Sequence, residues 1–332
     1  MSSRDLRIGI VGATGIVGAE LIFLLETRGT PISELHLFAS EKSGGKSIEA
    51  WGKSFSVKKL EKSALQNLDY MFFCSTEEIS LEFIPTAAAN GICCIDNSSA
   101  FRERSDVPLV VPEINHGDLA NHGNVIANPN CSTIIALMAI FPLHTAFGLR
   151  GFCASTYQAV SGVGRGGMEA LRLDNSGDFT LSREIFGEQI LHNAIPKIGK
   201  FLPNGYSTEE MKMLNESRKI LSLPELAVSS TCVRIPVARA HSMSIIAQFN
   251  LKPTLELVED ILAESEFVDF YSGDSFPSPL RQSNADSIGV GRLRADSFLE
   301  NALSMWVVGD QIRKGAALNA VQIMEYIESV GH

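Results

Sequence analysis

Continuously apolar runs, spaced through the first half of the chain, limit the possible folds more than any other feature. Helical stretches separate these runs, which are LRIGIVG (6–12), LHLFA (35–39), YMFFC (70–74), ICCIDN (92–97) and VIAN (125–128). Strands that are buried on both faces are apolar throughout rather than alternating, and strands that alternate with helices form parallel sheets. The pattern therefore predicts α/β structure, a Rossmann-type doubly wound parallel sheet domain.

The pattern changes after NPNCST, which ends at Thr133. A long apolar helix is expected at about 133–146, followed by a polar stretch near 175–225. Further strands are expected at 151–160, 227–237, 241–251 and 302–310. These elements predict an α+β catalytic domain with a large mixed sheet. Residues 268–298 are rich in Ser, Gly, Pro and Asp, which favours long loops.

The predicted domains are an N-terminal unit, 1–129, and a second unit, 130–310. The last stretch, 311–330, has apolar residues at helical spacing, so it is expected to form a helix that completes the first unit. A chain of 332 residues exceeds the size at which a single core usually stops growing.

Composition excludes several classes of protein. Hydrophobic residues make up 45% of the chain and charged residues 20%, which is typical of an ordinary enzyme and not of a disordered protein. A formal net charge of -10 disfavours a binder of nucleic acid or of anionic membranes. No signal peptide or membrane-spanning segment is expected, and six cysteines without a CxxC pair favour a reducing compartment, the cytoplasm.

The first apolar run leads directly into GATGIVG and then into an apolar helix. Glycines in such a turn permit a close approach to pyrophosphate, and the start of the helix supplies amide donors and a positive dipole. The spacing GxxGxxG departs from GxGxxG, and a simple packing turn is the alternative. The expected dinucleotide contacts are Gly12, Thr14, Gly15, Ile16 and Val17.

The end of the second run bears on the choice of dinucleotide. Ser40 with Lys42 or Lys46 suits the 2′-phosphate of NADP, whereas Glu41 suits the ribose of NAD. NADP is the expected cofactor. Ordinary solvated loop charges are the alternative interpretation.

Cys131 is the one cysteine with a chemical context. It follows the polar turn Asn128-Pro129-Asn130 and precedes an apolar helix, where the helix dipole and free amides stabilise a thiolate. The same amides are expected to hold a developing oxyanion. The other cysteines are expected to be mostly buried small hydrophobes.

A reactive thiol needs a proton donor or acceptor, and the chain has seven histidines. His36 and His144 lie in apolar runs, and His332 is terminal. His241 opens a predicted strand directly after CVRIPVARA, a position compatible with a cleft.

Together these motifs resemble the aspartate-semialdehyde dehydrogenase family over nearly the whole chain. The specific pieces are GATGIVG, DNSSAFR, ANPNCST, TYQAVSGVG, EEMKMLNESRKI, CVRIPVARAH and WVVGDQIRKGAA. Several ordered motifs are far more specific than any one of them. The resemblance implies an NADP-dependent enzyme of lysine, threonine, methionine and isoleucine biosynthesis that acts as a homodimer formed through its second domain.

The resemblance also implies residue roles. Cys131 is the nucleophile that forms a thioester, His241 the general acid and base, and Gln158 the residue that orients the intermediate. Arg102 and Lys212 bind phosphate, Glu209 the substrate ammonium, and Arg234 the substrate carboxylate. Ser40, Ser161, Gly162 and Gln311 join the cofactor contacts, and no metal is expected. As an alternative, Glu209 and Lys212, three residues apart on a helix, simply form an ion pair.

The implied reaction converts β-aspartyl phosphate to aspartate semialdehyde and phosphate, its small-molecule partners. Two alternatives remain: N-acetyl-glutamyl-phosphate reductase, which acts on an amide rather than a free amine, and a catalytically silent binding relative. The chain departs from the family pattern at Glu41, at CSTEEIS (74–80) and at Gln311, where an Asn is usual. All three departures concern the cofactor and none concerns the thioester.

Overall fold

The computed structural model describes residues 5–40 and 44–331. The chain divides into two compact units, Met1–Pro129 with Ala316–His332, and Asn130–Gly315. The sequence-based division drew the second boundary earlier, after residue 310. The first is unit 1 and the second is unit 2.

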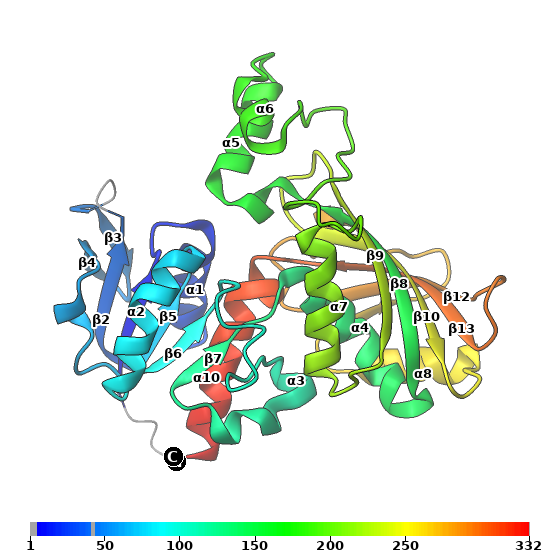
Figure 1. The fold of residues 1–332 in the computed structure, drawn as a ribbon, viewed down its shortest axis with the longest axis horizontal. Coiled ribbons are helices and arrows are strands. Elements are labelled where there is room, and N and C mark those ends of the chain that lie inside the picture. Colours follow the sequence, from blue (N-terminus) through cyan, green and yellow to red (C-terminus); the bar gives the residue numbers. More distant parts are fainter. Residues whose placement is uncertain (1–4, 41–43, 332) are drawn as a thin grey trace. The chain divides into compact units, whose positions relative to one another are not determined.

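Unit 1 contains a seven-stranded sheet in the order β3-β4-β2-β1-β5-β6-β7 (Figure 1). All neighbouring pairs are parallel except β3 with β4. The strands are β1 (Leu6–Val11), β2 (Ile32–Ala39), β3 (Ser47–Ala50), β4 (Lys53–Lys59), β5 (Tyr70–Phe73), β6 (Cys93–Asp96) and β7 (Val125–Ala127). The predicted Rossmann-type parallel sheet is confirmed.

Helices from both ends of the chain cover the sheet of unit 1. The helices are α1 (Ile16–Thr27), η2 (Lys62–Ala64), α2 (Glu77–Ala89), α3 (Pro112–Asn115), η3 (His116–Asn121) and α10 (Leu318–Val330). One buried cluster combines β1 and β5 with α1 and α10, so that Ile10, Leu25, Phe72 and Ile323 pack into the same core. The C-terminal helix is therefore an integral part of the first core.

Unit 2 is built on a six-stranded mixed sheet in the order β11-β12-β13-β10-β8-β9. Pairs β8–β9 and β11–β12 are parallel, and the other pairs are antiparallel. The strands are β8 (Leu149–Gln158), β9 (Ala227–Arg234), β10 (His241–Phe249), β11 (Val268–Tyr271), β12 (Ile288–Ala295) and β13 (Ala302–Gly309). The predicted large mixed sheet is confirmed.

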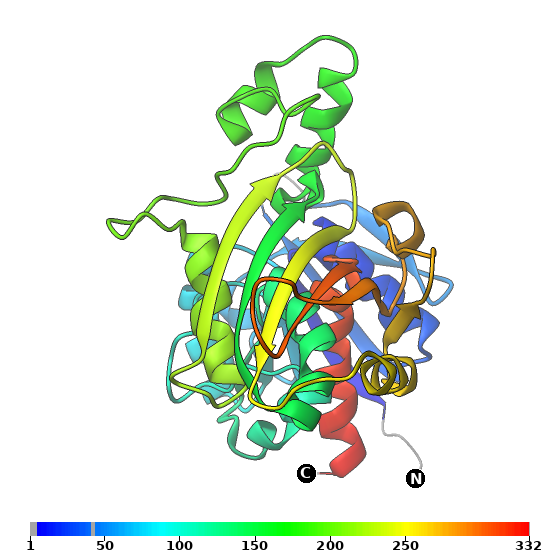
Figure 2. The ribbon, with the colours of Figure 1, turned by 90° about the vertical axis from the view of Figure 1, so that its right-hand side faces the viewer.

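One face of this sheet is covered by helices, and α4 contacts four of its strands. The helices of unit 2 are α4 (Cys131–Phe147), η4 (Val160–Val163), α5 (Arg165–Asp174), α6 (Thr180–Phe186), α7 (Thr208–Ile220), α8 (Leu255–Glu264) and α9 (Pro279–Gln282), and η5 (Arg313–Ala317) spans the boundary with unit 1 along the chain. Figure 2 looks onto the opposite face, where β8, β9 and β10 lie with no described helix in front of them.

Three details differ from the sequence-based expectations. Strands β3 and β4 were not predicted, because they alternate polar and apolar residues at the edge of a sheet that is elsewhere continuously apolar. Residues 268–298 are not only loops, because they include β11, α9 and all of β12. The C-terminal stretch is not one helix from residue 311, because a π-helical turn, η5, precedes α10.

Candidate active site

Several strands of unit 2 bring their ends, and with them three predicted site residues, to one edge of the sheet. Gln158 ends β8 and Arg234 ends the parallel strand β9, and the two are register partners. His241 begins β10, which runs antiparallel to β8, so its first residues lie beside the last residues of β8. All three side chains are at most 4% exposed. The topology of the sheet therefore collects an amide, a guanidinium and an imidazole.

Cys131 is the first residue of α4 and is half-buried. It lies beside this sheet edge, because its neighbour Ser132 accepts a hydrogen bond from Gln158 Nε2 at 2.6 Å. A cysteine at the start of a 17-residue helix feels the positive end of the helix dipole, which favours the thiolate. Burial, by contrast, raises the pKa of the Cys93 and Cys232 thiols to about 12.

The amides that follow Cys131 are occupied. Asn130 is the N-cap of α4, and its Oδ1 accepts from the N–H groups of Ser132 at 3.0 Å and Thr133 at 3.3 Å. These two amides are therefore engaged by the cap, and the expectation that amides at this helix start hold an oxyanion stays a prediction.

Glu209, on the first turn of α7, lies against the same turn. Its Oε1 accepts from Asn130 Nδ2 at 2.9 Å and from Gln158 Nε2 at 3.4 Å. Its Oε2 lies 3.3 Å from Lys212 Nζ, so the predicted ion pair exists, but this pair does not account for the other contacts. Burial opposes ionisation of Glu209, yet the Lys212 charge and the hydrogen bonds outweigh burial and hold its pKa below the ordinary value.

Helix α7 is fixed in place by its own sequence. Ser207 and Glu210 form a capping box, with Ser207 accepting from the Glu210 amide and Glu210 accepting from the Ser207 amide. Glu210 also accepts from the backbone of Cys232 in β9 at 3.0 Å. These contacts anchor the helix to the sheet, and they leave the neighbouring Glu209 directed at the Cys131 turn.

His241 is completely buried and held at one ring nitrogen. The Ala159 N–H donates to Nδ1 at 3.1 Å, so Nδ1 is an acceptor and the proton of the neutral ring lies on Nε2. Nε2 itself is buried and has no hydrogen-bond partner among residues 5–40 and 44–331. Burial, and then the charge of Arg234, hold the pKa of His241 well below its ordinary value. The ring is therefore neutral and has one donor to offer.

Arg234 is 4% exposed and donates from Nη1 to Ala159 O at 2.6 Å. Burial lowers the pKa of Arg234, although the acidic groups of Glu209 and Cys131 oppose this effect. A Cβ on Gly162 would lie 2.8 Å from Arg234 Nη1 and 3.5 Å from the His241 ring. Gly162 is therefore beside both side chains, and any other residue there would crowd them.

Unit 1 holds the predicted dinucleotide turn. Gly12 has φ +82, and a Cβ there would lie 2.1 Å from Cys74 O, while a Cβ on Gly18 would lie 2.3 Å from Gly12 O. Helix α1 begins after Gly15 with no side-chain cap and no acidic residue in its first turn. The turn thus combines a close backbone approach with uncapped amides, which fits a pyrophosphate. Thr14, Ile16 and Val17 are half-buried along it.

The remaining predicted residues of unit 1 are Ser40 and Arg102. Ser40 is exposed after β2, while Glu41 and Lys42, on which the choice between NADP and NAD depends, lie outside the described residues. Arg102 is 8% exposed and donates to Asn128 O at 2.9 Å and Asn97 O at 2.8 Å. Its assignment to phosphate stays a prediction.

Two residues that shape the Cys131 turn were not predicted as site residues. Asn130 is its cap, and Glu216, 2% exposed on α7, accepts from the Asn130 N–H at 2.6 Å. Asn before the first residue of a helix is a standard capping signal, so Asn130 could have been found. Glu216 lies seven residues after Glu209, two helical turns along one face, but only the fold brings that face to Asn130.

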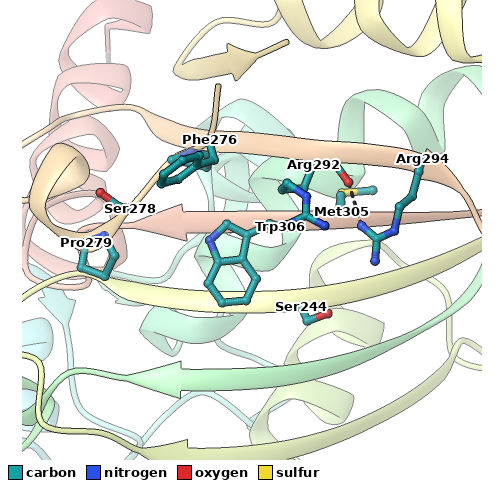
Figure 3. A pocket seen from close by; sticks show the side chains of 9 residues that line it. Ser244, Phe276, Ser278, Pro279, Arg292, Arg294, Met305 and Trp306 are labelled. Carbon is teal, nitrogen blue, oxygen red and sulfur yellow. Dashed lines mark hydrogen bonds between the residues drawn. The ribbon is translucent and has the colours of Figure 1, made fainter. Parts of the chain in front are cut away.

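A cavity of about 390 Å³ in unit 2 is separate from this constellation (Figure 3). It is lined by Phe276, Trp306, Arg292, Arg294 and neighbouring residues, none of which is a predicted site residue. Within residues 5–40 and 44–331, no group of His, Cys, Asp and Glu side chains could hold a metal ion. None of the helices in this part of the chain has the length and apolar character needed to cross a membrane.

Comparisons with known proteins agree with this geometry. Residues 7–122 match the family model "Semialdehyde dehydrogenase, NAD binding domain", and residues 140–314 match "Semialdehyde dehydrogenase, dimerisation domain". The chain is 42% identical to the aspartate-semialdehyde dehydrogenase of Aquifex aeolicus, with 98% of each chain covered. It is 38% identical to aspartate-semialdehyde dehydrogenase 2 of Vibrio cholerae, also over 98% of each.

Solved structures give the same result. The crystal structure of aspartate semialdehyde dehydrogenase II from Vibrio cholerae, complexed with ASA, superimposes with a TM-score of 0.94 at 38% identity and 98% coverage of each chain. Sequence motifs, fold and site geometry thus agree along nearly the whole chain, which belongs to the aspartate-semialdehyde dehydrogenase family.

Proposed function

We propose that this chain reduces β-aspartyl phosphate to aspartate semialdehyde and phosphate, with NADPH as reductant, through a thioester on Cys131. The observation that carries the proposal is the set of groups around one sheet edge of unit 2. A cysteine at a helix start, a neutral buried imidazole, a buried guanidinium and an ionised buried carboxylate meet there. This set suits a short substrate that carries a cation, a carboxylate and a reactive acyl group.

The first step is acyl transfer. The Cys131 thiolate attacks the acyl carbon, a C–S bond forms, and the C–O bond to phosphate breaks with the electron pair leaving on phosphate. The α4 dipole favours the thiolate, but the amides of Ser132 and Thr133 are bound to Asn130. The Nε2–H of His241 is therefore the donor best suited to the oxyanion.

NADPH, when bound, supplies the hydride that reduces the thioester carbonyl. The same His241 Nε2–H then faces the oxygen of the hemithioacetal on Cys131. When the carbonyl re-forms, the C–S bond breaks, the sulfur regains its electron pair and the aldehyde leaves. Gln158 is fixed between Ser132 and Glu209, where it orders the wall of the site.

Substrate recognition follows from charge. Glu209 is ionised and buried, so it suits an ammonium, and Arg234 suits a planar carboxylate. Lys212 is about a third exposed and, with Arg102, is proposed to bind phosphate. A substrate whose amine is acylated offers no ammonium to Glu209, which disfavours an N-acetylated substrate.

We further propose NADP as the preferred dinucleotide, the cytoplasm as location and a homodimer as the assembly. The Gly12–Gly18 turn supports a dinucleotide, and Ser40 supports a 2′-phosphate. The unit 2 sheet supports dimerisation, because its strands β8 and β13 bring together an aromatic pair, Tyr157 and Trp306, with ring centroids 5.4 Å apart.

The test follows the nicotinamide absorbance in the oxidative direction. The protein is mixed with aspartate semialdehyde and phosphate, and with either NADP or NAD. Phosphate-dependent reduction, faster with NADP, is expected, and inertness with both dinucleotides would refute the proposal. N-acetyl-glutamate semialdehyde is the matched control, and equal turnover of it would refute the role of Glu209. Sedimentation of the same sample reports the assembly.

A further inference from the structure

Asn130, the residue before Cys131, uses all of its polar groups inside unit 2. Its side-chain Oδ1 and its carbonyl oxygen accept from amides in the first turn of α4. Its N–H donates to Glu216 Oε2 at 2.6 Å, and its Nδ2 donates to Glu209 Oε1 at 2.9 Å. Both carboxyl groups belong to α7. The turn that carries Cys131 is therefore held between the start of α4 and two side chains of α7.

The two carboxyl groups differ in what else they contact. Glu209 also accepts from Gln158 Nε2 at 3.4 Å and pairs with Lys212 at 3.3 Å, and it is the residue proposed to bind the substrate ammonium. A bound ammonium then shares this carboxylate with Asn130. Glu216 is 2% exposed and lies seven residues further along α7, about 10 Å along the helix axis. Its hydrogen bond to the backbone of Asn130 therefore does not depend on how a substrate uses Glu209.

Helix α7 is a firm support for this contact. Its first turn is fixed by a capping box. In its last turn, Arg218 Nε donates to Leu226 O at 3.0 Å, in the segment that leads into β9. Asn130 is 6% exposed, so its N–H, once deprived of Glu216, must move to reach another acceptor. Any such movement of the Asn130 backbone displaces the next residue, Cys131.

We infer that Glu216 is a positioning residue for Cys131. By accepting from the Asn130 N–H it fixes the backbone before the cysteine, so that the sulfur stays at the start of α4 both before and after a substrate engages Glu209. The inference rests on the proposed function, in which the Cys131 thiolate attacks the acyl carbon. It predicts that loss of the acceptor at Glu216 lowers kcat and slows the reaction of Cys131 with other electrophiles, while KM changes little.

The test compares two substitutions of Glu216 in the full-length protein. Glu216→Met keeps the length of the side chain and removes the acceptor, whereas Glu216→Gln keeps a carbonyl oxygen for the Asn130 N–H. The matched control is Asp174→Leu, because Asp174 is 1% exposed and its Oδ2 accepts from two backbone N–H groups at 3.0 Å, outside the Asn130 contacts. Should Glu216→Met not fold, Glu216→Asp replaces it, since the shorter side chain withdraws the oxygen from the N–H.

Two measurements are made on each variant. Steady-state kinetics with aspartate semialdehyde, phosphate and NADP give kcat and KM. The rate at which iodoacetamide alkylates Cys131 is followed without substrate at neutral pH, by mass spectrometry of the peptide that contains this residue. The second measurement reports the thiol of the folded protein independently of turnover, so a loss of stability alone does not change it.

Glu216→Met is expected to lower kcat about 10- to 100-fold, to slow alkylation of Cys131 about 3-fold or more and to leave KM within about 3-fold of wild type. Glu216→Gln and Asp174→Leu are expected to stay close to wild type in both measurements. Wild-type kcat and alkylation in folded Glu216→Met, or a Glu216→Gln as impaired as Glu216→Met, would overturn the inference. A wild type without turnover, in which Glu216→Met still slows alkylation, would instead refute the proposed function, so the two failures are distinguishable.

Discussion

Helices α1 and α4 both begin after a strand and a short turn, and neither has an acidic residue in its first turn, but their free amides are treated differently. At α1 the cap position is Gly15, which has no side chain to offer, so the amides stay available to a bound phosphate. At α4 the side chain of Asn130 accepts hydrogen bonds from the amides of Ser132 and Thr133. A helix start alone therefore does not identify an anion site, because the residue at the cap position determines whether the first amide N–H groups stay free to bind a ligand.

The largest effect is expected from a substitution at the start of α4. Cys131→Ala removes the nucleophile at α4, so kcat is expected to fall by about 10⁴-fold or more. NADP affinity is expected to stay unchanged, because the α1 turn is intact. Steady-state kinetics and fluorescence titration with NADP measure the two effects. Residual turnover above a tenth of wild type would contradict the assignment of Cys131.

The second substitution is at the start of α1 and is expected to affect the binding of NADP. In Gly18→Ala the new Cβ would meet Gly12 O at 2.3 Å, so the turn must shift. The NADP dissociation constant is expected to rise about 10- to 100-fold, or about 1.4–2.7 kcal/mol. Gly117→Ala is the control, because a Cβ there meets nothing within 4 Å. Equal NADP binding by the two variants would remove the α1 turn from the cofactor site.

The cap of α4 is tested with two substitutions of Asn130. Asn130→Ala removes the acceptor for two amides and the donor to Glu209, so the free energy of unfolding is expected to fall by about 1–2 kcal/mol. Asn130→Asp keeps the cap but places a second carboxylate beside Glu209. Urea denaturation is expected to show the larger loss for Ala, and kinetics a clear loss for both. Full activity of Asn130→Asp would show that only the cap matters.

The smallest predicted effect is a pH dependence of stability. The pKa of His241 is depressed in the folded protein by burial and by Arg234, so below the ordinary value of 6.5 protons bind preferentially to the unfolded chain. The contribution of His241 to the free energy of unfolding is therefore complete above pH 6.5 and is lost as the pH falls below that value. Between pH 7.5 and 5.5 the loss is about 1 kcal/mol. His241→Gln should lose correspondingly less in urea denaturation at the two pH values, and an identical loss would show that His241 does not titrate in this way.

The sequence predicted the fold wherever the residues themselves carried the signal. The apolar runs around Ile10, Phe72 and Ile95 marked buried parallel strands, because such strands need apolar residues on both faces. Strands β3 and β4 carry no such signal, since they alternate at a sheet edge. Strand β12, IGVGRLRA, lies in a stretch rich in turn-forming residues, and its pairing with β13 is a long-range contact that local composition does not encode.

The candidate site was predictable where a residue type sits in a distinctive local context. Cys131 after a polar turn and His241 at a strand start are cases of this kind. The availability of a hydrogen-bonding group is different, because it depends on partners remote in sequence. The Nδ1 of His241 meets the amide of Ala159, and the amide of Gln311 meets Ser161. Only the assembled sheet edge reveals which donors remain for a ligand.

The helix α10 has a consequence for the order in which the protein can fold. Its residues Val321 and Ile323 are completely buried in the core of unit 1, although all of unit 2 separates them from the rest of that core along the chain. During synthesis, unit 2 emerges whole before α10 exists. Unit 1 can therefore complete its core only once the end of the chain is made, and until then the apolar surface that α10 covers stays exposed to water, as in other partly folded intermediates.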